Sequence, residues 1–285
     1  MIIDFHTHLF SKRIRAERES FFPGEPAFKL LYDSPRSKIV GADELVRQMD
    51  EDGIDKSVIF GFPWTDPAIY IRENDFIMEA VSRYPDRLIG FGCFDPCHEK
   101  AGEEAARCLD HGLSGIGELA IYQSGIDQEA RDRLEPVMDI CRKKDVPVLI
   151  HTNEPVGHMY PGKSPNTLSQ IYKTAKRYPD NRIIFAHWGG GIFFFLLLKK
   201  EAGDVLKNVW YDTAASPFLY QPDIFKHAMR LPGCREKILF GTDYPLLKSP
   251  RYFKELEKSG IAKSDIELIC GTNAAKVLKI PIKSC

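Results

Sequence analysis

The sequence predicts an α/β protein, a single (β/α)8 TIM barrel over residues 1–285 with an extra C-terminal helix. Two observations lead to this prediction. Short apolar segments alternate with longer amphipathic segments, which is the pattern of repeated βα units around a parallel sheet. The length also fits, because a barrel of this type commonly occupies about 250 residues as one domain.

Eight short and mostly apolar segments are predicted to be strands: residues 2–6, 56–61, 88–93, 115–119, 146–151, 183–187, 209–213 and 238–242. Eight longer segments are predicted to be helices: residues 42–52, 72–84, 99–111, 128–144, 167–178, 192–202, 222–230 and 250–258. A last helix at 264–278, capped by Ser264, is expected to pack across the outside of the barrel. Residues 12–38 form the one long irregular segment and are a candidate lid.

Composition and charge favour an enzyme that acts on small molecules. The formal net charge is −1, and no long basic block is present that would gather nucleic acid. The most apolar run, residues 191–198, is far shorter than the roughly 20 residues of a membrane helix. No signal core opens the chain, and the seven cysteines form no regular disulfide framework. We therefore expect a cytoplasmic protein with free thiols that binds neither nucleic acid nor membrane.

Potential metal ligands stand at the ends of the predicted strands. His6 and His8 close the first strand, and residues two apart on a strand point to the same face, so both imidazoles can reach one ion. Four more candidates end other strands: Glu118, His151, His187 and Asp243. Because the C-terminal face of such a barrel carries the active site, these six groups are expected to converge there.

The residue types of this set indicate a divalent metal. A single histidine at the end of a strand is more often a hydrogen-bonded core residue than a ligand, so the joint pattern carries the prediction. Imidazole and carboxylate are good ligands for Zn²⁺, which can keep one coordination position open for water. We therefore predict one or two divalent ions and expect them to be Zn²⁺.

The sequence resembles the amidohydrolase superfamily, and within it the amidohydrolase-related (amidohydrolase 2) family, across nearly the whole chain. Six segments carry the resemblance: IDFHTH at 3–8, GIGE at 115–118, PVLIHT at 147–152, FAHWGG at 185–190, LFGTDYP at 239–245 and GTNAA at 271–275. The resemblance implies that His6, His8 and Asp243 bind the principal ion. It also implies that His151 is a fourth ligand in members with one metal, while His187 contacts water or substrate.

The resemblance gives Glu118 a separate role. In relatives with two metals, a carboxylate of the fourth strand bridges the ions, and the counterparts of His151 and His187 hold the second ion. Glu118 occupies the place of that carboxylate. The Gly-Glu motif is also similar to that of hydrolytic members, whereas we do not expect the decarboxylases of the same branch to need this glutamate.

We therefore expect a metal-dependent hydrolase that cleaves an amide, lactone or other ester bond of a small molecule. A bound ion can lower the pKa of its water to about 7, and the resulting hydroxide is the expected nucleophile. Asp243 would pass the proton of the water to the leaving group, while His187 or the metal polarises the carbonyl.

Two other interpretations stay open. A nonoxidative decarboxylase of a small aromatic or unsaturated carboxylic acid would use the same centre, with Asp243 donating a proton to the carbon that loses CO₂. The ligands alone do not separate this reaction from hydrolysis. A noncatalytic metal-bound protein is the third interpretation, and it requires a closed coordination shell.

Candidate substrate-binding residues lie in the predicted loops. Arg36 and Tyr32 belong to the long first loop and are candidates for binding a substrate carboxylate, with solvated surface charge as the alternative. Trp64 and Trp188 are candidates for an aromatic wall, with ordinary packing as the alternative. Residues 193–198 are apolar on all sides of a predicted helix, and contact with a second copy of the chain is their candidate role.

Overall fold

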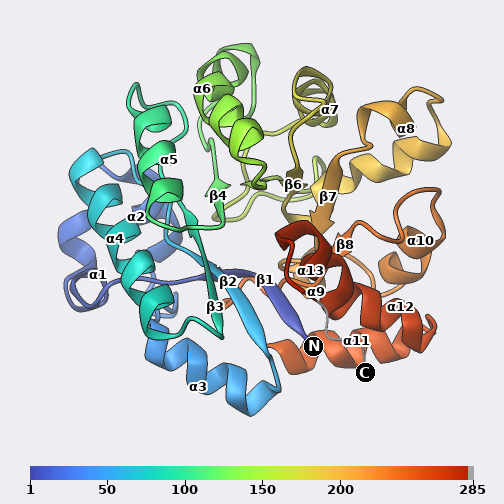
Figure 1. The fold of residues 1–285 in the computed structure, drawn as a ribbon, viewed down its shortest axis with the longest axis horizontal. Coiled ribbons are helices and arrows are strands. Elements are labelled where there is room, and N and C mark those ends of the chain that lie inside the picture. Colours follow the sequence, from blue (N-terminus) through green and yellow to red (C-terminus); the bar gives the residue numbers. More distant parts are fainter. Residues whose placement is uncertain (282–285) are drawn as a thin grey trace.

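The computed structural model describes residues 1–281 and forms a sheet of eight parallel strands in chain order. The strands are β1 (Ile3–His8), β2 (Lys56–Phe60), β3 (Leu88–Gly92), β4 (Gly115–Leu119), β5 (Val148–Ile150), β6 (Ile183–Phe185), β7 (Val209–Asp212) and β8 (Ile238–Leu239). The first and last strands meet, because the Phe5 amide donates to the Phe240 carbonyl at 2.7 Å. The predicted (β/α)8 barrel is therefore confirmed (Figure 1).

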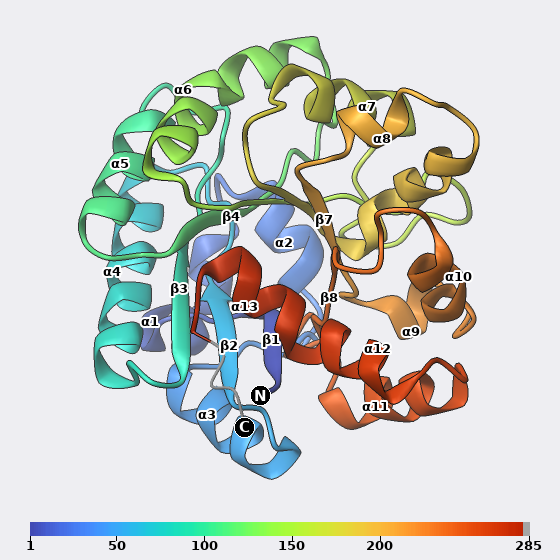
Figure 2. The same ribbon diagram turned by 45° about the vertical axis from the view of Figure 1, so that its right-hand side comes forward.

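Helices lie between the strands and surround the barrel (Figure 2). The longer ones are α3 (Ala42–Asp52), α4 (Pro67–Arg83), α5 (Ala101–Asp110), α6 (Gln128–Lys144), α7 (Leu168–Arg177), α10 (Ile224–Arg230) and α11 (Ser249–Lys258). Each overlaps a predicted helix. The largest shift is at α4, which begins five residues earlier than predicted because Asp66 caps it, accepting from the Ala68 amide at 2.8 Å.

The prediction of one helix at 192–202 is only partly confirmed. The chain forms a 3₁₀ segment, η2 (His187–Leu197), followed by the short α8 (Ala202–Val205). Trp188 and the three glycines after it have φ angles between 58° and 86°, in the left-handed region that interrupts a right-handed helix. Leu197 and Leu198 are 65% and 67% exposed, and a contact with a second copy through this segment stays a prediction.

The closing segment covers the end of the barrel at which the N-terminus lies, rather than packing across the outside of the barrel. The single helix predicted at 264–278 is divided into α12 (Lys263–Glu267), a π-helical turn (Leu268–Thr272) and α13 (Asn273–Leu278). Ala274, Ala275 and Val277 pack in one cluster with inward-facing strand residues such as Phe5. Figure 1 shows α13 over the end of the barrel where the N-terminus lies. The apolar face of α13 therefore covers an opening that would otherwise expose the barrel core.

Residues 12–38 are ordered into helices rather than irregular. They contain α1 (Lys12–Ala16), the 3₁₀ turn η1 (Arg18–Phe21) and α2 (Pro26–Tyr32). Phe28 of α2 packs on Trp64 and Phe62, which follow β2, with ring centroids 4.3 Å and 5.5 Å apart. The segment is thereby held at the C-terminal ends of the strands. Its action as a lid stays a prediction.

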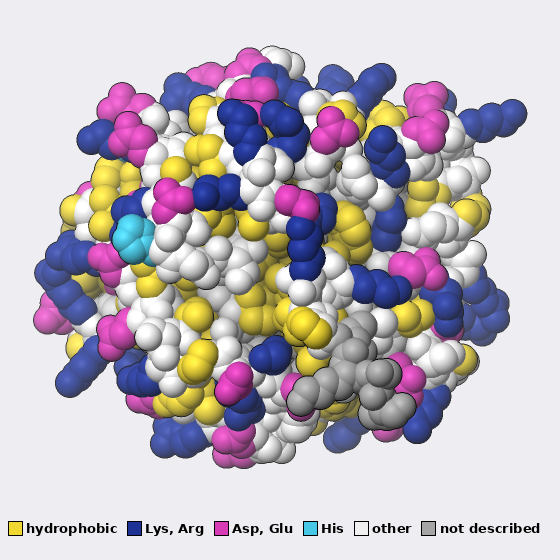
Figure 3. All heavy atoms as spheres, in the orientation of Figure 1, with side chains coloured by type: hydrophobic (Ala, Val, Ile, Leu, Met, Phe, Trp, Pro, Cys, Tyr) yellow, Lys and Arg dark blue, Asp and Glu magenta, His cyan; other side chains and the backbone are white. Residues whose placement is uncertain are grey.

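The surface carries charges of both signs. On the face that bears α13, Lys and Arg side chains alternate with Asp and Glu side chains (Figure 3), in agreement with the net charge of −1. Within residues 1–281, no helix combines the length and apolar character needed to cross a membrane. The described cysteines are free thiols, as predicted, and Cys285 lies outside the described residues.

The contact between the closing segment and the N-terminus predicts a specific loss of stability. A Cβ atom at Gly271 would lie 2.0 Å from the Met1 carbonyl oxygen, so Gly271→Ala must push the segment away from the barrel. We expect the free energy of unfolding to fall by about 1–3 kcal/mol, measured by thermal or urea denaturation. Gly203→Ala is the matched control, because nothing lies within 4 Å of its Cβ position. Equal stability of the two variants would contradict this account of the barrel end.

Candidate metal centre

The six predicted ligands converge at the C-terminal ends of the strands. They come from β1, from β4 and from the segments that follow β5, β6 and β8: His6, His8, Glu118, His151, His187 and Asp243. All are largely withdrawn from water. The side chain of Asp243 is the most open of the six at 16% exposure, and that of His6 is fully buried.

Three of these groups lie within 3.6 Å of one another, and Glu118 approaches two of them. The Nε2 atoms of His6 and His8 are 3.2 Å apart, and Asp243 Oδ1 lies 3.6 Å from the first and 3.2 Å from the second. Glu118 Oε2 lies 3.6 Å and 3.8 Å from the same two nitrogens. Donors bound at about 2.1 Å to one ion lie roughly 3.0–3.5 Å from one another. The residues present therefore fit a divalent cation.

Glu118 also faces the remaining two histidines. Its other oxygen, Oε1, lies 2.9 Å from His151 Nδ1 and 3.4 Å from His187 Nε2. One carboxylate thus presents one oxygen to each pair of histidines. This arrangement allows the carboxylate either to bridge two ions or to serve a single ion while it holds His151 and His187 in place.

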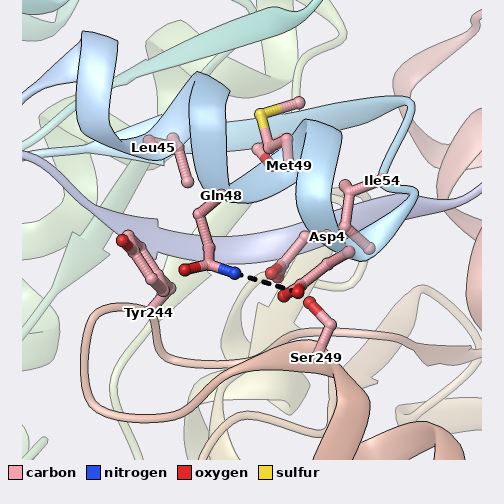
Figure 4. A pocket seen from close by; sticks show the side chains of 9 residues that line it. Asp4, Leu45, Gln48, Met49, Ile54, Tyr244 and Ser249 are labelled. Atoms are coloured by element: carbon pink, nitrogen blue, oxygen red, sulfur yellow. Dashed lines mark hydrogen bonds between the residues drawn. The ribbon is translucent and has the colours of Figure 1, made fainter.

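An irregularity in β1 directs its two histidines toward the centre. The register of β1 against β2 shifts between Asp4 and Thr7, and such bulges re-aim side chains beside active sites. Phe5 lies in the inner barrel cluster, whereas Asp4 lines a cavity of about 10 Å³ under α3, together with Gln48 and Ser249 (Figure 4). Asp4 accepts hydrogen bonds from the amide and hydroxyl of Thr242 at 3.0 Å and 2.6 Å. The residue before Asp243 is therefore tied to the strand that carries His6 and His8.

Backbone carbonyls orient two of the imidazoles. His8 Nδ1 lies 3.0 Å from the Gly61 carbonyl oxygen, and His187 Nδ1 lies 3.0 Å from that of Ala214. A carbonyl oxygen can only accept, so Nδ1 donates and carries the proton in both rings. The Nε2 atoms are left free to bind a cation, which is the usual arrangement of metal-binding histidines.

Asp212 performs the same task for His6, and the sequence analysis missed it. Its Oδ2 accepts from His6 Nδ1 at 2.8 Å, while its Oδ1 accepts from the amides of His187 and Ala214 at 2.9 Å and 3.0 Å. The carboxylate is fully buried. The sequence did contain a signal for Asp212. It is a charged residue near the end of the strand predicted at 209–213, and the six proposed ligands also stand at the ends of predicted strands.

The charges of the centre keep its carboxylates ionised. Burial would raise the pKa of Glu118, yet the charges of His6 and the neighbouring histidines hold it well below its usual range. Burial would also raise the pKa of Asp243, but the hydrogen bond with His8 and the charge of His6 outweigh it, so the pKa is lowered. In the opposite sense, Glu118 raises the pKa of His187 to about 9 against the effect of burial. Paired anionic oxygens among imidazoles are the surroundings that a divalent cation requires.

Two members of the centre adopt a strained backbone. His187 and Asp243 have φ angles of 53° and 63°, in the left-handed region that non-glycine residues seldom occupy. Such residues cost of order 1–3 kcal/mol each and persist where surrounding contacts hold them. Here the amide of His187 donates to Asp212, and that of Asp243 donates to the His6 carbonyl at 3.0 Å.

Tyr32 is the candidate substrate-binding residue that lies near the centre. It is 9% exposed, and burial together with the charges of Asp243 and Glu118 raises its pKa. Tyr122, which the sequence analysis did not select, has the same surroundings, because burial and the charge of Glu118 raise its pKa too. No spacing in the sequence connects these two tyrosines.

The other three candidates lie elsewhere. Trp64 and Trp188 are both fully buried, so neither indole has surface to offer a substrate. Trp188 donates from Nε1 to Ser216 Oγ at 2.9 Å, and Trp64 packs against Phe28. Their alternative role, ordinary packing, agrees with this burial. Arg36 is exposed at the end of the helical cover, as expected of solvated charge.

Fold and donor set together define a class of protein. A (β/α)8 barrel whose strand ends gather histidines and carboxylates at one point is the arrangement of a metal-dependent amidohydrolase-type enzyme. The chain belongs to the amidohydrolase family, since the model of that family matches residues 3–280. The resemblance noted in the sequence motifs is thus confirmed.

Comparison with known proteins adds three relatives. The 2-amino-3-carboxymuconate-6-semialdehyde decarboxylase of Dictyostelium discoideum is 25% identical, over 97% of this chain and 93% of that protein. The gamma-resorcylate decarboxylase of a Polaromonas species is also 25% identical, over 84% and 87%. Among solved structures, a dihydroxybenzoic acid decarboxylase of Polaromonas with bound manganese and 2-nitroresorcinol has a TM-score of 0.72 at 20% identity, covering 98% of this chain and 97% of that one.

These relatives overturn the prediction of a hydrolase. The proteins that this chain resembles over most of its length are decarboxylases, so the main functional prediction was wrong. The error came from Glu118, whose presence was taken as a sign of hydrolysis. In the structure Glu118 contacts His6, His8, His151 and His187 at once, so it can orient and neutralise histidines whatever reaction follows.

The contact between Asp212 and His6 predicts a change in metal affinity. Asp212→Asn removes the negative charge beside His6 Nδ1, and losing such an outer partner typically weakens metal binding 10–100-fold. We expect this loss for Mn²⁺ or Zn²⁺ in competition with a chelating dye. Asp204→Asn, at an exposed carboxylate on α8, is the matched control. Equal affinity in the two variants, both folded by circular dichroism, would show that Asp212 does not support the centre.

The packed donor set also predicts that metal stabilises the fold. A ligand that binds only the folded state adds about 2.7 kcal/mol at 100 times its Kd. We therefore expect EDTA treatment followed by dialysis to lower the melting temperature and added Mn²⁺ to restore it. His8→Ala should abolish the response to the ion, because it removes a donor that lies within 3.8 Å of donor atoms of His6, Glu118 and Asp243. An unchanged melting temperature on saturation with Mn²⁺ or Zn²⁺ would contradict the site.

Proposed function

We propose that this chain catalyses the nonoxidative, metal-dependent decarboxylation of a small aromatic or unsaturated carboxylic acid. The observation that carries the proposal is the joint one: a cluster of six imidazole and carboxylate groups on a fold whose full-length relatives are decarboxylases. Neither part suffices alone, because the ligands also suit hydrolysis. The reaction converts R–COO⁻ and a proton into R–H and CO₂.

The residues proposed to hold the principal ion are His6, His8 and Asp243, with Glu118 beside them. His151 and His187 face the other oxygen of Glu118 and are proposed either to hold a second ion or to contact the substrate. When bound, the ion would supply positive charge that binds the substrate carboxylate and orients the carbon to be protonated. A related structure contains manganese, so we propose that Mn²⁺ and Zn²⁺ both be tested.

Asp243, ionised at rest, is proposed to accept a proton from solvent and to deliver it to the substrate. Its side chain is the most exposed of the six and lies 3.2 Å from His8, so it can meet both solvent and substrate. A proton placed on the carbon that bears the carboxylate forms the new C–H bond. The C–C bond to the carboxylate then breaks, its electron pair returns to the ring or chain, and CO₂ leaves. His187 is proposed to contact the substrate during these steps.

The proposal is tested by measuring CO₂ and the fate of the proton together. Protein loaded with Mn²⁺ or Zn²⁺ is expected to release CO₂ from 2,6-dihydroxybenzoate or 5-carboxyvanillate, and in D₂O the vacated carbon should carry deuterium. Asp243→Asn should reduce the rate about 10²–10⁴-fold, the range expected for loss of a general acid. Metal content must be measured for this variant, because Asp243 is also a proposed ligand.

Asp180→Asn, an exposed carboxylate at the far end of α7, is the matched control and should keep the full rate. Deuterium in the product at a rate unchanged by Asp243→Asn would exclude Asp243 as the proton donor. Absence of CO₂ release from a broad set of aromatic and unsaturated acids, by protein shown to contain metal, would refute the proposed function itself.

A further inference from the structure

We propose that Tyr32 and Tyr122 determine substrate specificity, with their hydroxyl groups binding a neutral hydrogen-bonding substituent of the substrate, such as a phenol group. The inference rests on the proposed decarboxylase function and names the part of the substrate that the site selects. Neither tyrosine belongs to the donor set of the metal centre.

Tyr32 is held in place at both ends of α2. Glu25 precedes this helix and is 2% exposed, and its carboxylate accepts from the amides of Thr65 and Asp66 at 2.9 Å each. At the other end, Arg18 Nη1 donates to the Tyr32 carbonyl at 3.2 Å. The helix is therefore anchored to the loop after β2, and the phenol is presented in a fixed place rather than on a loose loop.

Tyr122 is positioned by aromatic contacts. Its ring stacks on Phe62 with centroids 6.3 Å apart and planes inclined by 10°, and it lies 5.5 Å from the ring of His151. Phe62 also packs edge to face against Tyr32, with centroids 6.0 Å apart. The two tyrosines therefore flank one phenylalanine beside a proposed ligand of the centre.

The two hydroxyl groups have no partner of their own. Among residues 1–281, neither phenol forms a hydrogen bond, although other tyrosines such as Tyr178 and Tyr252 do. Both tyrosine rings pack on Phe62, and the ring of Tyr122 also contacts that of His151. Two neutral donors thus lie close to each other in the field of the centre.

This arrangement favours a particular ligand. The two hydroxyls are not sealed off inside the protein, so a substrate that offers a hydroxyl or carbonyl oxygen can take the place of water on them. A substrate that lacks the group leaves both hydroxyls dehydrated and unpaired, so a site built in this way discriminates more strongly than apolar contact does. A tyrosine hydroxyl can pair with an uncharged oxygen of the substrate, which leaves the charged carboxylate for the proposed ion.

The test compares two non-reacting ligands that differ by one hydroxyl group, 2-nitroresorcinol and 2-nitrophenol. Isothermal titration of metal-loaded protein is expected to show that the wild type prefers 2-nitroresorcinol. Tyr32→Phe and Tyr122→Phe should each weaken its binding about 10-fold, the value of one hydrogen bond, and leave 2-nitrophenol within about 2-fold. Tyr84→Phe is the matched control. Tyr84 lies at the end of α4 and its hydroxyl donates to Asp43, so the variant should bind both ligands as the wild type does.

Kinetics provide a second measurement. With a hydroxylated acid as substrate, both variants should raise KM about 10-fold with a smaller effect on kcat, because the hydroxyls bind without moving the reacting proton. Equal losses for both ligands, or no loss, would overturn the proposal. A wild type that releases no CO₂ but keeps the ligand preference in titration would refute the decarboxylase function and leave the tyrosine pair as a binding determinant.

Discussion

The metal centre depends on the closure of the barrel between its first and last strands. Asp4 and Thr242 are 238 residues apart in sequence, and the buried hydrogen bonds between them hold the end of β8 against β1. Asp243 follows directly, and its amide donates to the His6 carbonyl. Since the donor atoms of the two segments must lie within about 4 Å of one another, any opening of this junction would separate the carboxylate from both histidines of β1.

The same region shows how buried charge is tolerated. Anions and imidazoles alternate through the site: Asp212 faces His6, His6 faces Glu118 and Asp243, and Glu118 faces His151 and His187. Each charge has a partner of opposite sign within hydrogen-bonding or near-contact distance, which is the condition for keeping ionised groups out of water. A divalent cation adds positive charge where the carboxylates are concentrated and so completes this balance.

Hydrolysis and decarboxylation require much of the same apparatus. Both need a divalent cation, a proton carrier and a carboxylate-rich centre, so the ligand set does not identify the reaction. The distinction must come from the groups that contact the rest of the substrate. In this chain the residues beside the centre include aromatic side chains on the helical cover and after β2 and β4.

The sequence by itself determined the barrel and the ligand candidates. Alternating apolar and amphipathic segments are local patterns, and each of the eight strands overlaps its predicted range because side-chain periodicity depends on neighbouring residues. His6, His8 and Asp243 could be selected because strand ends in this fold share one face. The family followed from the same motifs, since they surround the ligands in the order that the barrel requires.

The tertiary structure decided the rest, because those features arise between segments that are distant in sequence. Asp212 becomes an orienting group through contact with a histidine more than two hundred residues away, and Tyr122 reaches the centre because Phe62 supports it. The closing segment covers the end of the barrel because its apolar face packs on inward-facing strand residues. The sequence pattern of the segment does not show which part of the barrel that face contacts. Only packing in three dimensions could separate the two buried tryptophans from the tyrosines that lie beside the centre.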